Sequence, residues 1–142
     1  MLFRSAGDGA FGISANEMTA VGRDEWPAIT MVIFRNYQWG AEKRNTTLWY
    51  QDNFVGTELD LDVQYAKIAE ACGLKGVQVT TMQELTEALD AAVKAQMDNK
   101  TTTFIEVILN QELGEPFRRD AMKAPVEVAG INPGDMRPQK GA

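Results

Sequence analysis

The stretch that decides the fold is Ala6 to Gly12, "AGDGAFG", which matches the dinucleotide-binding pattern G-x-G-x-x-G. In such a site the anionic pyrophosphate lies against the glycine turn, yet the second position of this turn is Asp8, a carboxylate. The match is therefore either a tight turn that binds nothing, or a site in which a cation lies between Asp8 and the phosphates.

Outward from this turn, the chain alternates between helices and strands. Helical spacing of apolar residues predicts helices over Gly12 to Arg23, Asp60 to Gly73 and Thr81 to Asp98. Short runs of apolar and β-branched residues predict strands over Ala28 to Phe34, Gly76 to Thr80 and Thr101 to Leu109. The polar and aromatic stretch after Asn36 predicts a long loop. This alternation predicts an α/β fold, a parallel sheet with helices on both faces.

The two ends of the sequence are less regular. Met1 to Ala6 lies where a strand should precede the glycine turn, but Arg4 and Ser5 make it a poor buried strand. We therefore expect that the fold can lack its first strand or strands, and that Met1 to Ser5 can be foreign to the parent protein. Prolines and glycines predict an irregular carboxyl-terminal segment. The predicted organisation is one domain over residues 1–109 and a tail over residues 110–142.

The composition excludes several functions. The chain has 142 residues, a formal net charge of -6 and a pI of about 4.7, which argues against a nucleic-acid or anionic-membrane partner. It contains no histidine, so His-based catalysis and His-ligated zinc are excluded within this chain, and its single cysteine has no disulfide partner. Neither a membrane-spanning apolar run nor a signal peptide is recognisable, and we expect a cytoplasmic protein.

Asp8 and Asn36 are candidate metal ligands. Each follows the carboxyl end of an expected strand, and one helix joins the two strands, as in a βαβ unit. If these strands pair in a parallel sheet, the Asp8 carboxylate and the Asn36 amide oxygen lie at one edge. Oxygen ligands suit Mg²⁺ or Ca²⁺, and Mg²⁺ is commonly held by one or two protein groups plus substrate phosphates. A cation that bridges Asp8 to a diphosphate would explain the carboxylate in the glycine turn.

A Rossmann-type module that binds NADP without a metal is the alternative of another class. In a direct dinucleotide site an acidic residue ends the second strand and contacts the ribose, whereas this chain has Arg35 and Asn36 there. Under this alternative, Arg35 would bind the 2′-phosphate of NADP.

The motif resembles that of a known enzyme family. "GDG" at Gly7 to Gly9, followed one βαβ unit later by Asn36, resembles the diphosphate-binding motif of the thiamine-diphosphate-dependent enzymes. The resemblance implies that the Asp8 carboxylate, the Asn36 amide and the backbone carbonyl of Gln38 bind Mg²⁺. Where many members have a second asparagine, this chain has Tyr37. The other residues implied to contact the diphosphate, through their backbone, are Gly7, Gly9, Ala10, Phe11, Gly40 and Ala41.

A closer resemblance covers nearly the whole chain. Residues 34–60, "FRNYQWGAEKRNTTLWYQDNFVGTELD", and residues 109–131, "LNQELGEPFRRDAMKAPVEVAGI", are similar to the carboxyl-terminal part of the sulfoacetaldehyde acetyltransferases. The implied reaction converts sulfoacetaldehyde and phosphate into acetyl phosphate and sulfite, in taurine and sulfonate catabolism. An acetolactate-synthase-like carboligase or decarboxylase that uses the same site is the sibling alternative.

The resemblance also has implications for partners and substrate binding. In these enzymes a glutamate of a separate amino-terminal domain, usually from the neighbouring subunit, activates the cofactor. We therefore expect this chain to be the diphosphate-binding part of a homodimeric or homotetrameric enzyme, inactive by itself. Four cations are candidate ligands of the substrate's sulfonate or of phosphate: Lys43, Arg44, Arg118 and Arg119. A solvated charged surface is the other interpretation of these four.

Overall fold

The structure is a computed structural model that describes residues 1–23 and 25–111. These residues divide into two compact units, one formed by Met1–Gln38 with Leu59–Gln111 and the other including Trp39–Glu58. The tail expected over residues 110–142 lies almost wholly outside the described residues, so the domain boundary after residue 109 stays a prediction. Among the described residues, no helix is both long enough and apolar enough to cross a membrane.

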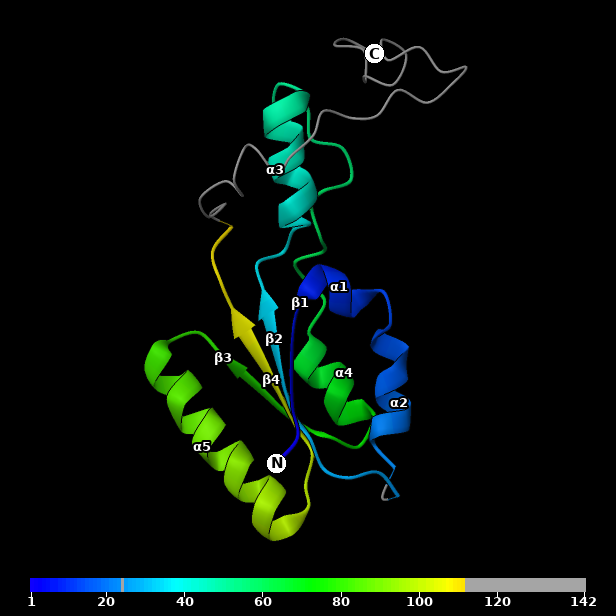
Figure 1. The fold of residues 1–142 in the computed structure, drawn as a ribbon, viewed down its shortest axis with the longest axis vertical. Helices are drawn as coiled ribbons and strands as arrows, with labels where there is room; N and C mark the ends of the chain where they lie inside the picture. The colour runs from blue at the N-terminus through cyan, green and yellow to red at the C-terminus, as the bar shows by residue number, and fades with distance from the viewer. Residues whose placement is uncertain (24, 112–142) are drawn as a thin grey trace. The chain divides into compact units, whose positions relative to one another are not determined.

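The first unit is built on a parallel four-stranded sheet of order β1-β2-β4-β3 (Figure 1). Its strands are β1 (Phe3–Gly7), β2 (Thr30–Arg35), β3 (Lys75–Val79) and β4 (Thr103–Ile108). The predicted parallel α/β sheet is confirmed, and the strand before the glycine turn is present as an edge strand. β1 pairs with β2 so that Gly7 lies opposite Phe34, and the residues after these two strands therefore emerge at one edge of the sheet.

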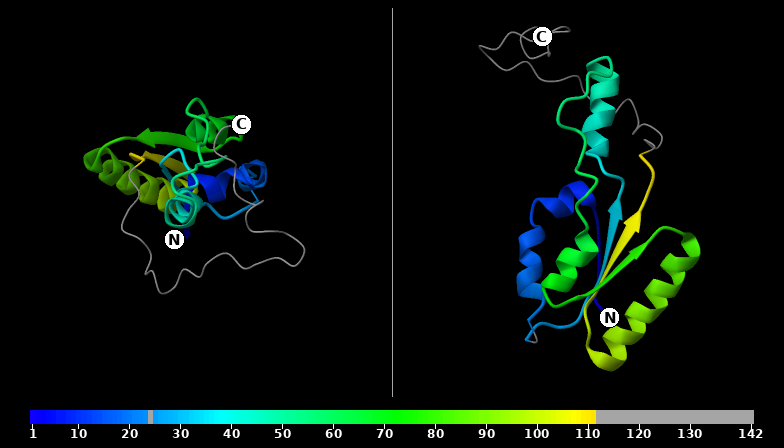
Figure 2. Two further views of the ribbon diagram at one scale, coloured as in Figure 1. Left: turned by 90° about the horizontal axis from the view of Figure 1, so that it is seen from above. Right: turned by 180° about the vertical axis from the view of Figure 1, so that it is seen from behind.

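Helices cover both faces of the sheet, as Figure 2 shows from two further directions. One face packs on α5 (Met82–Asn99), and the other on α1 (Asp8–Gly12), the 3₁₀ helix η1 (Ala15–Glu17), α2 (Met18–Val21) and α4 (Tyr65–Ala71). The buried cluster beneath α5 consists of Val32, Val79, Ala92, Ile105 and Val107. The cluster on the other face consists of Met18, Ile33, Ala69, Leu74 and Phe104. Two apolar cores on one sheet explain why β2 and β4 carry apolar side chains on both faces.

The start of α5 is a capping box, formed by Thr81 and Glu84. The Thr81 hydroxyl accepts a hydrogen bond from the Glu84 N–H at 3.2 Å, and the Glu84 carboxylate accepts one from the Thr81 N–H at 3.0 Å. The Thr80 N–H and hydroxyl also donate to this carboxylate, at 2.8 and 2.9 Å. These hydrogen bonds, those from Thr80 first, lower the pKa of Glu84 from its ordinary value.

Two of the predicted helices differ from the observed ones. The segment expected as one helix over Gly12 to Arg23 begins earlier, at Asp8, and is divided into α1, η1 and α2, because Ser14 takes a non-helical conformation (φ -128°, ψ 27°). The helix expected from Asp60 begins only at Tyr65. The carbonyl oxygens of Asp60 and Leu61 accept hydrogen bonds from Arg35 instead, and Leu61, expected on the buried face, is 67% exposed.

The second unit contains a helix that the sequence reading missed. α3 (Gly40–Trp49) lies within the stretch expected to be a loop. Its sequence, "GAEKRNTTLW", has no apolar stripe at helical spacing, so nothing in it predicts a buried helical face. Within this unit the Trp39 N–H donates to the Thr57 carbonyl at 2.7 Å, and Lys43 forms an ion pair with Glu58.

Candidate functional site

The carboxyl ends of β1 and β2 bring Asp8 and the segment after Asn36 into contact. Asp8, the first residue of α1, is 2% exposed. Its Oδ1 accepts a hydrogen bond from the Gly9 N–H at 2.9 Å, and its Oδ2 accepts one from the Tyr37 N–H at 2.8 Å. These two backbone donors hold the carboxylate in one orientation and leave further lone pairs on both oxygens.

The Asn36 amide oxygen lies between this carboxylate and the Gln38 carbonyl oxygen. Asn36 Oδ1 lies 3.1 Å from the Gln38 carbonyl oxygen and 3.2 Å from Asp8 Oδ1. In this orientation the amide oxygen faces only acceptors, whereas the opposite orientation of the amide would let its nitrogen donate to both oxygens. A carboxylate, an amide and a backbone carbonyl that converge in this way need either that donor or a cation between them.

The spacing and chemistry of these oxygens fit a hard divalent cation. Ligands of an octahedral Mg²⁺, bound at roughly 2.0–2.1 Å and at right angles, lie about 3 Å apart, close to the two distances around Asn36. The described residues contain no group of three or more His, Cys, Asp or Glu side chains placed to bind a metal. In the predicted set Asp8 would supply the one carboxylate, and an amide and a carbonyl the other two oxygens, so that a bound Mg²⁺ would keep net positive charge for phosphates. That these three residues bind metal stays a prediction.

The glycine turn leaves space along its backbone. A Cβ built at Gly7 would meet no atom within 4 Å, and its backbone (φ -81°, ψ 159°) suits any residue. Neither packing nor conformation therefore requires glycine here, as expected if a ligand approaches the backbone. Ala10 is exposed, whereas the Phe11 side chain packs on Tyr65 and Phe104 at 5.2 Å between ring centroids. The Phe11 ring is therefore half-buried by aromatic contacts, whereas Ala10 is open to solvent.

Tyr65 of α4 adjoins the turn from the other side. Its hydroxyl lies 3.1 Å from the position that a Cβ on Gly12 would take, and its ring meets Phe11 edge to face. Burial, and then the negative charge of Asp8, raise the pKa of the Tyr65 phenol from 10.0. The phenol is therefore neutral over the physiological range and available as a hydrogen-bond donor.

The other predicted site residues lie in the second unit or outside the described residues. Gly40 and Ala41 begin α3 in the second unit, together with Lys43 and Arg44. The Lys43 ammonium pairs with Glu58 and lies 5.2 Å from the centroid of the Phe54 ring. Arg118 and Arg119 lie outside the described residues. The roles of these residues in cofactor or substrate binding stay predictions.

Arg35 is not placed as an NADP site requires. It is 2% exposed, and its guanidinium forms an ion pair with Glu106 at 2.6 Å and donates to the carbonyls of Asp60 and Leu61. A buried, fully paired guanidinium cannot reach a 2′-phosphate. The sequence reading also missed Glu106, although a single carboxylate in the apolar run "TFIEVI" is the signal that would have found it.

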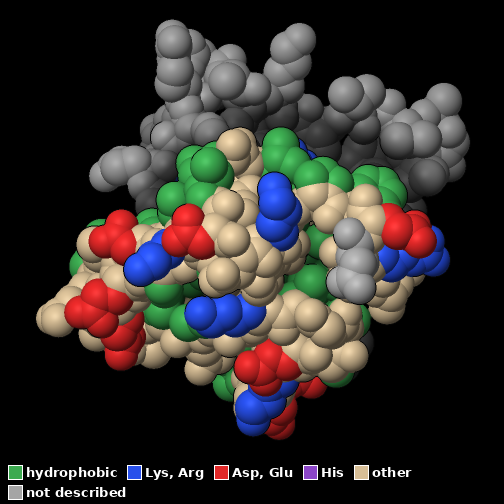
Figure 3. Space-filling model, turned by 90° about the horizontal axis from the view of Figure 1, so that it is seen from below, with side chains coloured by type: hydrophobic (Ala, Val, Ile, Leu, Met, Phe, Trp, Pro, Cys, Tyr) green, Lys and Arg blue, Asp and Glu red, His purple; other side chains and the backbone are tan. Residues whose placement is uncertain are grey.

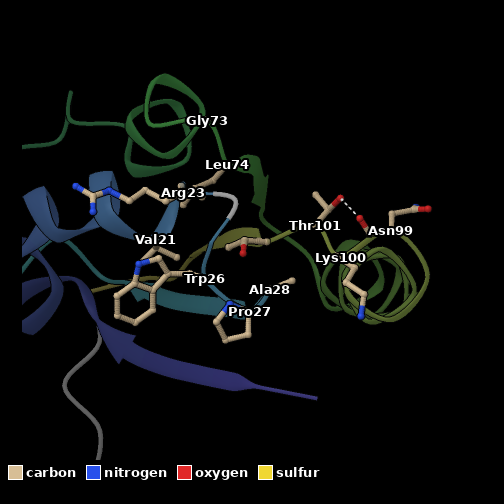
Figure 4. Close-up of a pocket in the computed structure, with 12 residues that line it drawn as sticks. Val21, Arg23, Trp26, Pro27, Ala28, Gly73, Leu74, Asn99, Lys100 and Thr101 are labelled. Atoms are coloured by element: carbon tan, nitrogen blue, oxygen red, sulfur yellow. Dashed lines mark hydrogen bonds between the residues drawn. The ribbon is translucent and has the colours of Figure 1, made fainter.

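A pocket lies at the opposite end of the sheet. It has a volume of about 420 Å³, lies before β2, β3 and β4, and contains none of the predicted site residues (Figure 4). Trp26, one of the residues that line it, is 59% exposed, and the charged ends of Arg23 and Lys100 point away from each other. Seen from this end, basic and acidic side chains are interspersed on the described surface (Figure 3). A smaller pocket of about 230 Å³ includes Ala10 and Phe11.

Comparison with known proteins identifies the family. Residues 3–107 match the model of the thiamine pyrophosphate enzymes, C-terminal TPP binding domain. The chain belongs to this family. It is 73% identical over 134 residues to the sulfoacetaldehyde acetyltransferase of Rhodobacter capsulatus and 71% identical over 135 residues to that of Roseovarius nubinhibens. These matches cover 94% and 95% of the chain, but the chain spans only 22% of the length of either relative.

A solved structure agrees with this assignment. The crystal structure of benzoylformate decarboxylase from Polynucleobacter necessarius superposes with a TM-score of 0.68 at 28% sequence identity. The superposition covers 81% of this chain and 20% of that one. The TPP-binding domain thus accounts for the sheet of this chain and for the glycine turn at its edge.

Proposed function

We propose that this TPP-binding domain binds the diphosphate of thiamine diphosphate through one Mg²⁺ held by Asp8, Asn36 and Gln38. The Asn36 amide oxygen, which faces Asp8 Oδ1 at 3.2 Å and the Gln38 carbonyl oxygen at 3.1 Å as ligands of one cation would, is the observation that supports the proposal. Asp8 contributes the negative charge, and the N–H groups of Gly9 and Tyr37 keep its carboxylate turned to the cation.

Other residues of the chain hold the diphosphate itself. Gly7 keeps the approach to the turn free of a side chain, and the backbone of Gly9, Ala10 and Phe11 is the expected contact surface for phosphate oxygens. Gly40 and Ala41 are the expected contacts from α3. When bound, thiamine diphosphate supplies a nucleophilic carbon and an electron sink, which is why a domain without histidine can belong to an enzyme.

For the whole protein we propose acetyl transfer from sulfoacetaldehyde to phosphate, with release of sulfite, in taurine and sulfonate catabolism. Identity of 71–73% to relatives named sulfoacetaldehyde acetyltransferase supports this reaction over that of an acetolactate-synthase-like carboligase or decarboxylase. Lys43, Arg44, Arg118 and Arg119 are the proposed ligands of the sulfonate or of phosphate. A homodimer or homotetramer in the cytoplasm is part of the same proposal.

Calorimetry with the chain tests the cofactor assignment. We expect thiamine diphosphate to bind in the presence of Mg²⁺ and to lose measurable affinity when EDTA removes the metal. NADP, titrated with and without Mg²⁺, is the control ligand for the Rossmann alternative. Binding of thiamine diphosphate that is indifferent to EDTA, or metal-independent binding of NADP, contradicts the proposal.

A chimeric enzyme tests the whole reaction. The carboxyl-terminal segment of the Rhodobacter capsulatus enzyme that aligns with this chain is replaced by the chain itself. We expect the chimera to release sulfite and form acetyl phosphate from sulfoacetaldehyde and phosphate. A folded chimera that instead forms acetolactate from pyruvate would favour the carboligase alternative.

A further inference from the structure

The strained residue of the site is Tyr37. Its backbone is left-handed (φ 60°), a conformation that is unfavourable for a residue other than glycine. Tyr37 lies between Asn36, whose amide oxygen approaches Asp8, and Gln38, whose carbonyl oxygen approaches that amide oxygen. The turn at Tyr37 therefore lets two nearly consecutive residues present oxygens to one point, and something must hold it in that conformation.

Three partners hold Tyr37 from different sides. Its N–H donates to Asp8 Oδ2 at 2.8 Å, and its carbonyl accepts from the Leu59 N–H at 2.9 Å. The Arg35 guanidinium lies 4.4 Å from the centroid of its ring, within the range of a cation–π contact. The ring of Tyr65 lies 5.2 Å from the same guanidinium. Arg35 is thus the group that fixes the Tyr37 side chain.

Arg35 is in turn fixed by the core of the sheet. Its partner Glu106, on β4, is fully buried and lies 2.6 Å from Nη1. The Glu106 carboxylate also accepts from the N–H groups of Tyr65 and Ala66, at 3.3 and 3.0 Å, and from Gln78 at 3.2 Å. These hydrogen bonds hold the Glu106 carboxylate in one orientation. A continuous set of contacts therefore leads from β4 through Arg35 to the Tyr37 turn.

Stability alone does not account for two charges at this position. Replacing a buried ion pair by apolar side chains of similar volume is commonly neutral or stabilising, because desolvation offsets the attraction. A pair that positions a ligand-bearing turn, by contrast, resembles the outer partners of metal ligands, which orient the ligands without touching the metal. We propose that Arg35, Glu106 and Tyr37 are positioning residues that align the oxygens of Asp8, Asn36 and Gln38, an inference that rests on the proposed Mg²⁺ site.

Two measurements on the same variants test this inference separately from the proposed function. The variants are Tyr37→Ala, the double replacement Arg35→Met with Glu106→Leu, and the conservative Tyr37→Phe and Arg35→Lys. Hydrogen exchange of the residue 37 amide, followed by NMR without metal, reports whether its bond to Asp8 persists. Titration with Mn²⁺ in the presence of thiamine diphosphate reports metal affinity, and thermal unfolding reports whether each variant is folded.

We expect the residue 37 amide to exchange at least about tenfold faster in Tyr37→Ala and in the folded double variant. The Mn²⁺ dissociation constant should rise by roughly 10- to 100-fold in both, as for loss of an outer-shell partner. Tyr37→Phe, which keeps the ring, should restore protection, and Arg35→Lys, which loses the planar group, should give an intermediate effect. If the double variant does not fold, Tyr37→Ala and Arg35→Lys carry the test.

The outcomes distinguish the positioning role of Arg35, Glu106 and Tyr37 from the proposed metal site. Unchanged exchange of the residue 37 amide in folded Tyr37→Ala and Arg35→Lys overturns the positioning role, whatever the metal does. Unchanged Mn²⁺ affinity in variants whose amide has lost protection overturns it as well. A wild-type chain that binds no Mn²⁺ overturns the proposed metal site, while the exchange measurement still decides whether the pair holds the turn.

Discussion

The two ends of the sheet use glycine differently. At the amino ends of the strands glycines serve packing, because a Cβ at Gly22 would lie 2.1 Å from the Cys72 carbonyl oxygen, and one at Gly76 would lie 2.2 Å from that of Ala66. At the carboxyl ends, a Cβ at Gly7 would touch nothing within 4 Å. The larger pocket lies at the first end and the convergent oxygens at the second. If the proposed site is correct, the end of the sheet that binds the cofactor is marked by convergent polar groups and not by the larger pocket.

The largest expected effect is a loss of cofactor affinity on substitution at the carboxyl end of the sheet, with no loss at the amino end. Asp8→Ala removes the only proposed ligand that carries a charge, so we expect Mg²⁺-dependent affinity for thiamine diphosphate to fall by more than about 100-fold. Arg23→Ala, at the pocket of the opposite end, and Asp90→Ala, an exposed aspartate of α5, are matched controls. Calorimetry measures all three. An affinity that drops with Arg23→Ala and survives Asp8→Ala would reverse the comparison.

Alanine should be tolerated differently at Gly76 and at Gly7. Gly76→Ala should lower the free energy of unfolding by about 1–3 kcal/mol, because its Cβ would overlap a backbone oxygen of α4. Gly7→Ala should change that free energy by less than about 0.5 kcal/mol, since nothing crowds it, yet weaken thiamine diphosphate binding. Urea unfolding and calorimetry on both variants check the pair. A large loss of stability in Gly7→Ala would mean that packing, not a ligand, keeps this glycine.

Some features of the fold and of the candidate site can be predicted from the sequence, and others cannot. The strand and helix pattern, the capping box at Thr81 and the residues of the glycine turn follow from local periodicity and turn chemistry. α3 could not be read because its polar sequence has no apolar face. The Arg35–Glu106 pair could not be read either, since residues on two strands meet only through the strand order of the sheet. Local signals thus gave the candidate ligands but not what holds them.

Loss of the capping box that follows the carboxyl end of β3 should have a smaller effect, and on stability. Thr81→Ala should cost about 1 kcal/mol of stability through loss of the N-cap hydrogen bond. The pKa of Glu84 is lowered in the folded state, so its stabilising effect is present above its ordinary value of 4.5 and is lost as pH falls through the folded-state pKa. Urea unfolding across this acidic range should show a weaker pH dependence in Glu84→Gln. An identical dependence in both proteins would argue against the capping box in solution.

The smallest expected effect is spectroscopic. Because burial and the Asp8 charge raise the pKa of Tyr65, its phenol should ionise above pH 10.0. The stability linked to this group is complete below that pH and declines as pH rises toward the folded-state pKa. Ultraviolet difference titration of wild type against Tyr65→Phe isolates the phenol, and Asp8→Asn should lower its pKa. Ionisation of Tyr65 at or below its ordinary value would show that the charge and the ring are not neighbours.

The most direct test of the central claim is the position of one metal ion. Crystals of the chain grown with thiamine diphosphate and Mn²⁺ allow the ion to be located by its anomalous scattering. We expect a single peak with Asp8 Oδ1, Asn36 Oδ1 and the Gln38 carbonyl oxygen each within about 2.3 Å. An ion bound elsewhere, with the Asn36 amide nitrogen turned toward Asp8 and Gln38, would contradict the account.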